Sequence, residues 1–151
     1  VYMSIYVAMN LGMFACIFLM KRDGKYCENL NDLSGISKHH PILSISLLII
    51  LFSLAGIPPL AGFFAKFYIF MSVIESGMYT LAIVGLLSTV ISAFYYLRII
   101  KIIYFDDANK HFDEIKNLGI STTLLLSSLL LVTFFAYPSF LNNIVATLII
   151  N

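Results

Sequence analysis

The chain has 151 residues, of which 60% are hydrophobic and 11% are charged, and its formal net charge is +1. Soluble domains are about 45–50% apolar and about 25% charged, so this composition excludes an ordinary water-soluble domain. The small net charge gives no reason to expect a nucleic-acid partner. Because the apolar segments are continuous rather than alternating, the sequence predicts an all-α integral membrane protein.

Charged residues divide the sequence into four apolar segments within a single membrane domain, 1–151. A helix needs about 20 apolar residues to span the hydrocarbon core. We therefore expect four transmembrane helices, with polar loops at 21–40 and 106–117. The helices are predicted at about 1–20, 41–74, 78–105 and 118–137. Residues 138–151 form an apolar tail that is too short for a fifth span.

Lysine and arginine residues gather on one side of this predicted bundle. Four spans place both termini and the turn at 75–77 on one side of the membrane, and both polar loops on the other. The basic residues outside the membrane all lie in or beside those loops: Lys21, Arg22, Lys25, Lys38, Arg98, Lys101, Lys110 and Lys116. The positive-inside rule then places the loops in the cytoplasm or the mitochondrial matrix.

The second apolar segment, 41–74, is too long for one straight helix and contains residues that break a helix. At about 1.5 Å per residue it would measure about 50 Å, against a hydrocarbon core of about 30 Å. Pro58 and Pro59 have no N–H groups, so carbonyls one turn earlier, near Leu54, lose their donors. Gly56 tolerates unusual backbone angles. The sequence therefore predicts a long helix broken between Gly56 and Pro59.

Lys66 is the only charged residue in this broken segment. A lysine at the centre of a membrane helix costs roughly 2.5–3.5 kcal/mol on insertion scales, so we interpret it as functional, in ion or proton handling. Gly62 precedes it by four residues on the same helical face, which is expected to leave room for water or a partner group. Broken helices of this sort build ion sites in transporters. The alternative is a structural lysine that reaches the headgroups, although about 13 Å of helix separates Lys66 from Glu75.

Two further groups of polar residues are candidate linings for a proton path. Hydroxyl side chains recur at spacings of three and four on one face of the third predicted helix: Ser88, Thr89, Ser92 and Tyr96. Such residues can order water, or they simply let helices approach closely. Histidine is the side chain that most readily exchanges protons at physiological pH, so His39 and His40 are either a proton entry or a solvated loop pair. Cys16 and Cys27 have no metal or redox spacing and are expected to be incidental.

The broken segment also carries a family resemblance. The stretch Leu54–Phe67, with the sequence LAGIPPLAGFFAKF, resembles the signature of the antiporter-like subunits of respiratory complex I. With Tyr95–Arg98 and the opening stretch Tyr6–Phe14, the chain is similar to subunit 2 of mitochondrial NADH dehydrogenase, the equivalent of the bacterial N subunit. Lysine at position 66 favours subunit 2 over subunit 4, whose equivalent residue is typically glutamate.

The resemblance implies a proton-translocating subunit of the complex I membrane arm, which couples electron transfer from NADH to ubiquinone to proton pumping. It implies the C-terminal part of an antiporter-like helical bundle, with Lys66 as the proton carrier. The chain itself would hold no redox site and no cofactor. NADH, FMN, iron–sulfur clusters and ubiquinone would be bound by other subunits of this translocase.

The resemblance also sets expectations for partners and location. The partners would be other membrane-arm subunits and lipids. Since the chain begins at Val1 rather than at a methionine, it would be either a fragment or the product of a split gene that a separate N-terminal polypeptide of the same subunit completes. The location would be the mitochondrial inner membrane, with both polar loops in the matrix, or alternatively a bacterial plasma membrane. Two other functions stay open: a cation–proton antiporter subunit with the same fold, and a non-catalytic scaffold of the membrane arm.

Overall fold

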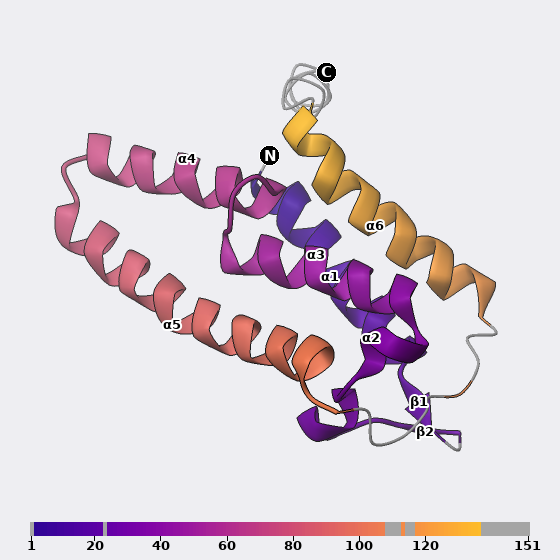
Figure 1. The fold of residues 1–151 in the computed structure, drawn as a ribbon. Coiled ribbons are helices and arrows are strands. Elements are labelled where there is room, and N and C mark those ends of the chain that lie inside the picture. Colours follow the sequence, from indigo (N-terminus) through magenta and orange to yellow (C-terminus); the bar gives the residue numbers. More distant parts are fainter. Residues whose placement is uncertain (1, 23, 108–112, 114–116, 137–151) are drawn as a thin grey trace, which may run out of the picture.

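The computed structural model of the chain describes residues 2–22, 24–107, 113 and 117–136 (Figure 1). Its long helices are α1 (Tyr2–Leu19), α3 (Pro41–Ala55), α4 (Ala61–Glu75), α5 (Tyr79–Phe105) and α6 (Leu118–Ala136). Between α1 and α3 the chain forms β1 (Lys21–Arg22), β2 (Lys25–Tyr26), η1 (Leu30–Leu33) and α2 (Ile36–His39). The predicted tail, 138–151, lies outside the described residues.

The packed centre of the molecule is made by α1, α3 and α6. Figure 1 shows α6 running alongside α1, with α3 against both. Fully buried side chains from all three helices meet there, including Ile5, Leu47, Ile50 and Leu131. Because these helices are apolar on every face, burial is decided by which helices pack together rather than by a polar stripe. This centre holds α3 in place, and α3 carries one half of the helix break.

The hairpin of α4 and α5 extends away from this centre (Figure 1). The two helices are joined by a short turn with Gly77 at a φ of 73°. The large apolar side chains of α5 mostly face outward, and its buried residues are Ala82 near the start and Ile100, Ile102 and Ile103 near the end. A continuous apolar surface of this kind is covered by lipid or by another chain.

The predicted break in the second apolar segment is confirmed. α3 ends at Ala55 and α4 begins at Ala61, so the segment forms two half-helices. Within the described residues, α1 and α5 are long and apolar enough to cross a membrane, whereas α3 and α6 are shorter apolar helices. Each half-helix has 15 residues, fewer than the about 20 that a span needs, so α3 and α4 are both required to cross the membrane.

The predicted polar loop at 21–40 contains more structure than we expected. Strands β1 and β2 pair antiparallel, with Lys21 opposite Tyr26, and the Lys21 ammonium lies 4.6 Å from the centre of the Tyr26 ring. Arg22 forms an ion pair with Asp32 at 2.8 Å. The sequence did contain one signal for this hairpin, an Asp-Gly dipeptide that ends at Gly24 and favours a tight hairpin turn. Two-residue strands are too short for a periodic pattern to reveal them.

Both basic segments lie at one end of the bundle, as the charge pattern predicted. The backbone N–H of Asp113 donates to the Lys21 carbonyl at 2.9 Å, and its carboxylate accepts from the Gly24 N–H at 2.9 Å. The Ser37 hydroxyl donates to the Ile103 carbonyl at the end of α5 at 3.1 Å. The first polar loop is therefore tied both to α5 and to the segment before α6.

Cys27 lies in this polar end, and we expect it to react slowly with alkylating reagents. Burial raises the pKa of its thiol, and the nearby Arg22 charge offsets only part of that effect. A raised pKa leaves less thiolate near pH 7.5 than in an unfolded chain, and the difference closes as the pH passes the raised pKa. Mass spectrometry of iodoacetamide-treated protein measures the rate, with the fully buried Cys16 as an unlabelled control. Equal folded and unfolded rates at pH 7.5 would contradict the prediction.

Candidate functional site

The end of α3 is closed by Gly56 in a left-handed conformation, with φ 80° and ψ 36°. The N–H of Ile57 donates to the Phe52 carbonyl at 3.0 Å, and the N–H of Gly56 donates to the Ser53 carbonyl at 3.0 Å. This pair of bonds is a Schellman motif, which satisfies carbonyls that the end of a helix leaves without partners. Glycine is needed at position 56 because other residues are strained at this φ.

Lys66 satisfies the next carbonyl in the sequence. Its Nζ donates to the Leu54 carbonyl oxygen at 2.8 Å, across the break from α4 to α3. The prediction that a carbonyl near Leu54 would lose its helical donor is confirmed, and its partner is the lysine itself. The negative end of the α3 dipole faces the ammonium, an arrangement that favours a cation. Lys66 is thus a half-buried cation bonded to the end of a half-helix.

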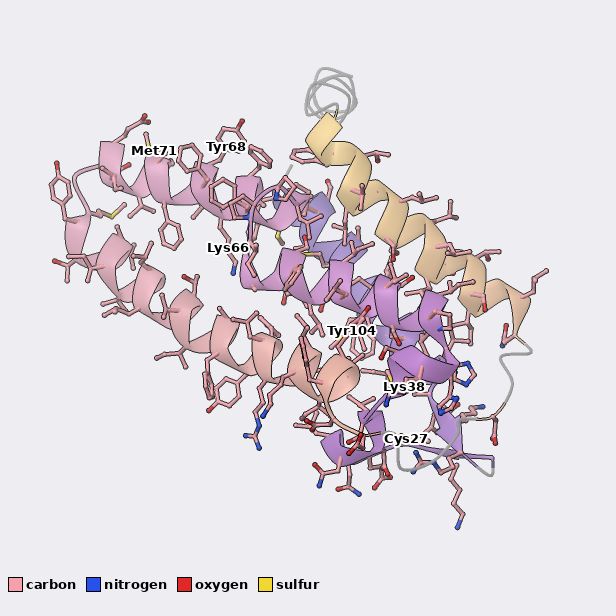
Figure 2. All side chains as sticks on the ribbon, viewed as in Figure 1. Cys27, Lys38, Lys66, Tyr68, Met71 and Tyr104 are labelled. Carbon is pink, nitrogen blue, oxygen red and sulfur yellow. The ribbon has the colours of Figure 1, made fainter. Side chains whose placement is uncertain are left out.

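The lysine stem passes directly over Gly56. A Cβ added to Gly56 would lie 3.1 Å from Cδ and 3.5 Å from Nζ of Lys66. Figure 2 shows the Lys66 side chain leaving α4 toward the end of α3, in the space between α4 and α5. Gly56 therefore has two roles: it turns the chain at the end of α3, and it leaves space for the lysine.

The start of α4 is fixed on the same end of α3. The Gly62 N–H donates to the Ser53 hydroxyl oxygen at 3.0 Å, and a Cβ on Gly62 would overlap the Ser53 carbonyl oxygen. We expected Gly62 to leave room beside Lys66 for water or a partner group. That interpretation was wrong, because the backbone of Ser53 fills the space. We did not predict a role for Ser53, which is one of three serines in the apolar half-helix α3, so its presence alone did not distinguish it.

The predicted hydroxyl row on α5 is present, and its hydroxyl groups are bonded within their own helix. Ser88 donates to the Gly85 carbonyl at 2.8 Å, Thr89 to Leu86 at 2.7 Å and Ser92 to Ser88 at 2.9 Å. Tyr96 packs against the buried core. Among the described residues, no hydrogen bond joins this row to Lys66. The row stays a candidate lining, and water would have to bridge it to the ammonium.

The histidines lie far from Lys66. His39 ends α2 and His40 precedes the first residue of α3, whereas Lys66 contacts the other end of α3. A 15-residue helix is about 22 Å long, so the structure does not bring these groups together. A proton path from the histidines to Lys66 would have to follow the whole length of α3.

The fold and this site define a membrane helix bundle with a lysine at a broken helix, a class to which ion-translocating subunits belong. Residues 1–92 match the family described as "NADH:quinone oxidoreductase/Mrp antiporter, TM". The chain belongs to this family.

Individual relatives narrow the assignment. The chain is 62% identical to NADH-quinone oxidoreductase subunit N of Pelagibacter ubique, over 97% of this chain and 31% of the relative. It is 45% identical to subunit N of Rhodospirillum rubrum, over 92% of this chain and 28% of the relative. The predicted resemblance to the N-type subunit is confirmed, and the chain spans less than a third of the length of these relatives.

A solved structure shares the fold. A chain of respiratory complex I from Thermus thermophilus with bound aureothin superposes with a TM-score of 0.76 at 24% identity. The match covers 91% of this chain and 31% of that chain. The fold of this chain is therefore shared with part of a longer chain of that complex.

Proposed function

We propose that this chain is the proton-carrying C-terminal part of subunit N in an NADH:quinone oxidoreductase. The observation that carries the proposal is the 2.8 Å bond from the Lys66 ammonium to the Leu54 carbonyl at the helix break. A charge held this way at membrane depth has a polar partner without leaving the bundle. The relatives named above supply the reaction in which such a charge would serve, since each is a subunit N of NADH-quinone oxidoreductase.

In this proposal Lys66 holds a proton at Nζ and releases it to water on one side of the break. The Leu54 carbonyl supports the charged form, and neighbouring charges in the complete enzyme shift the balance between the two protonation states. The hydroxyl row at Ser88, Thr89 and Ser92 would order the water that carries the proton. NADH, FMN, iron–sulfur clusters and ubiquinone would be held by other subunits, which transmit the redox energy to this one.

We place the subunit in a bacterial plasma membrane, with both polar loops in the cytoplasm. The relatives named above are bacterial, which favours this location over the mitochondrial inner membrane. The partners would be other membrane-arm subunits and the polypeptide that supplies the rest of subunit N. Lipid or a neighbouring subunit would cover the exposed apolar face of α5.

A cation–proton antiporter subunit is the second candidate, because the description of the matched family also includes Mrp antiporters. Such a subunit would use the same broken helix and Lys66 for ion exchange without electron transfer. The two functions therefore differ in the proteins that accompany the chain rather than in the site.

Purification in mild detergent, followed by mass spectrometry of everything recovered, separates these functions. We expect membrane-arm subunits, NADH-oxidising subunits and the upstream helices of subunit N. Recovery with antiporter subunits and without redox subunits would contradict the proposal in favour of the second candidate. Recovery of the chain alone would also contradict it, since a membrane-arm subunit has permanent neighbours.

A further inference from the structure

Ser53 makes a hydrogen bond across the helix break although it lies on an apolar half-helix. Its side chain is fully buried, and its hydroxyl oxygen accepts from the Gly62 N–H at 3.0 Å. The first N–H groups of a helix have no partner within that helix, and a buried one without a partner is destabilising. Ser53 therefore supplies from α3 the acceptor that α4 lacks at its own start.

A second fully buried serine of α3 makes a different kind of hydrogen bond. Ser44 is also fully buried, but its hydroxyl donates to the His40 carbonyl at 3.0 Å, one turn back along the chain. Such a bond stays within one helix end and connects no separate elements. Ser44 is thus a matched control for Ser53, with the same residue type, helix and burial.

The bond from Ser53 also fixes the position of Lys66 relative to the end of α3. Two bonds join the half-helices: Gly62 N–H to the Ser53 hydroxyl, and Lys66 Nζ to the Leu54 carbonyl. The two acceptors are adjacent in the sequence, and the two donors lie one turn apart on one face of α4. When Gly62 is fixed, the stem of Lys66 starts at the level from which its ammonium reaches Leu54.

We propose that Ser53 is a positioning residue for Lys66, which holds the first turn of α4 on the last turn of α3 and so keeps the ammonium at the Leu54 carbonyl. The inference rests on the proposed proton-carrying function of Lys66. Without the hydroxyl, the Gly62 N–H loses its acceptor and the start of α4 is free to shift. The lysine then spends less time at its carbonyl partner, and proton transfer through it slows.

The test compares Ser53→Thr with Ser53→Val in the complete enzyme, reconstituted in proteoliposomes. Threonine and valine have nearly the same shape, so the two variants share any crowding from the added methyl group and differ in the hydroxyl. We expect S53V to pump about threefold to tenfold more slowly than S53T, the range set by losing one hydrogen bond. Ser44→Val and Ser44→Thr should pump alike. In a Lys66→Met background, S53V and S53T should also pump alike.

The outcomes separate this inference from the proposed function. Normal pumping by Lys66→Met would reject the role of Lys66, and the inference with it. Impaired pumping by Lys66→Met together with equal rates for S53T and S53V would reject the inference alone. If neither Ser53 variant assembles, Ser53→Ala is compared with wild type in the same assay. Loss of assembly in Ser53→Ala as well would overturn the inference, because Ser53 would then be needed for folding rather than for placing Lys66.

Discussion

We expect proton pumping by the complete enzyme to fall by about a hundredfold when Lys66 is replaced by methionine, the lower end of what a positioned proton-transfer group contributes. Methionine has a similar length but neither carries a proton nor donates to the Leu54 carbonyl. The assembled complex should survive the change. Leaving that carbonyl without a donor costs about 1–3 kcal/mol, while removing an intramembrane charge returns roughly 2.5–3.5 kcal/mol. The two effects nearly cancel, so the loss appears in transport rather than in assembly.

A pH-sensitive dye inside proteoliposomes measures pumping, and blue native electrophoresis measures assembly. Lys101→Met is the matched control, because Lys101 is an exposed lysine near the polar end of α5 and should pump normally. Normal pumping by an assembled Lys66→Met enzyme would contradict the proton-carrier role. It would instead support the interpretation that this chain is a non-catalytic scaffold of the membrane arm.

The helix break could be predicted from the sequence because its causes are local. Pro58 and Pro59 cannot donate to preceding carbonyls, whatever the rest of the fold does. Gly56 is the residue best able to close a helix in a left-handed conformation. The common side of the two basic loops was predictable for a similar reason, since it needs only the order of apolar and basic segments.

The partner of Lys66 and the role of Gly62 could not be predicted in the same way. A glycine one turn before a lysine leaves space if nothing approaches it, and permits close packing if a backbone does. Which case holds depends on the direction in which α4 leaves the break relative to α3. The five residues between the half-helices do not determine that direction from the sequence alone. The same uncertainty hid Ser53, whose importance lies in a bond to a residue nine positions away.

The second large expected effect is at Gly62 itself. Replacing Gly62 by alanine should destabilise the helix break by about 3 kcal/mol, the upper part of the usual range for overpacking. The added Cβ would overlap the Ser53 carbonyl oxygen, which is backbone held in the Schellman motif rather than the tip of a flexible side chain. Alanine gains only about 0.8–1.0 kcal/mol of helix propensity over glycine, so it cannot offset the clash.

Gly85→Ala provides the control for this prediction, because Gly85 also lies inside a helix. There the added Cβ would approach an edge atom of the Phe70 ring at 2.9 Å, and a side-chain ring can move aside. The same gain in propensity then makes Gly85→Ala close to neutral. Thermal unfolding of the purified enzyme and the yield of assembled complex measure both variants. Equal stability of the two would mean that the half-helices do not meet through their backbones, and Ser53 would lose the contact on which its positioning role depends.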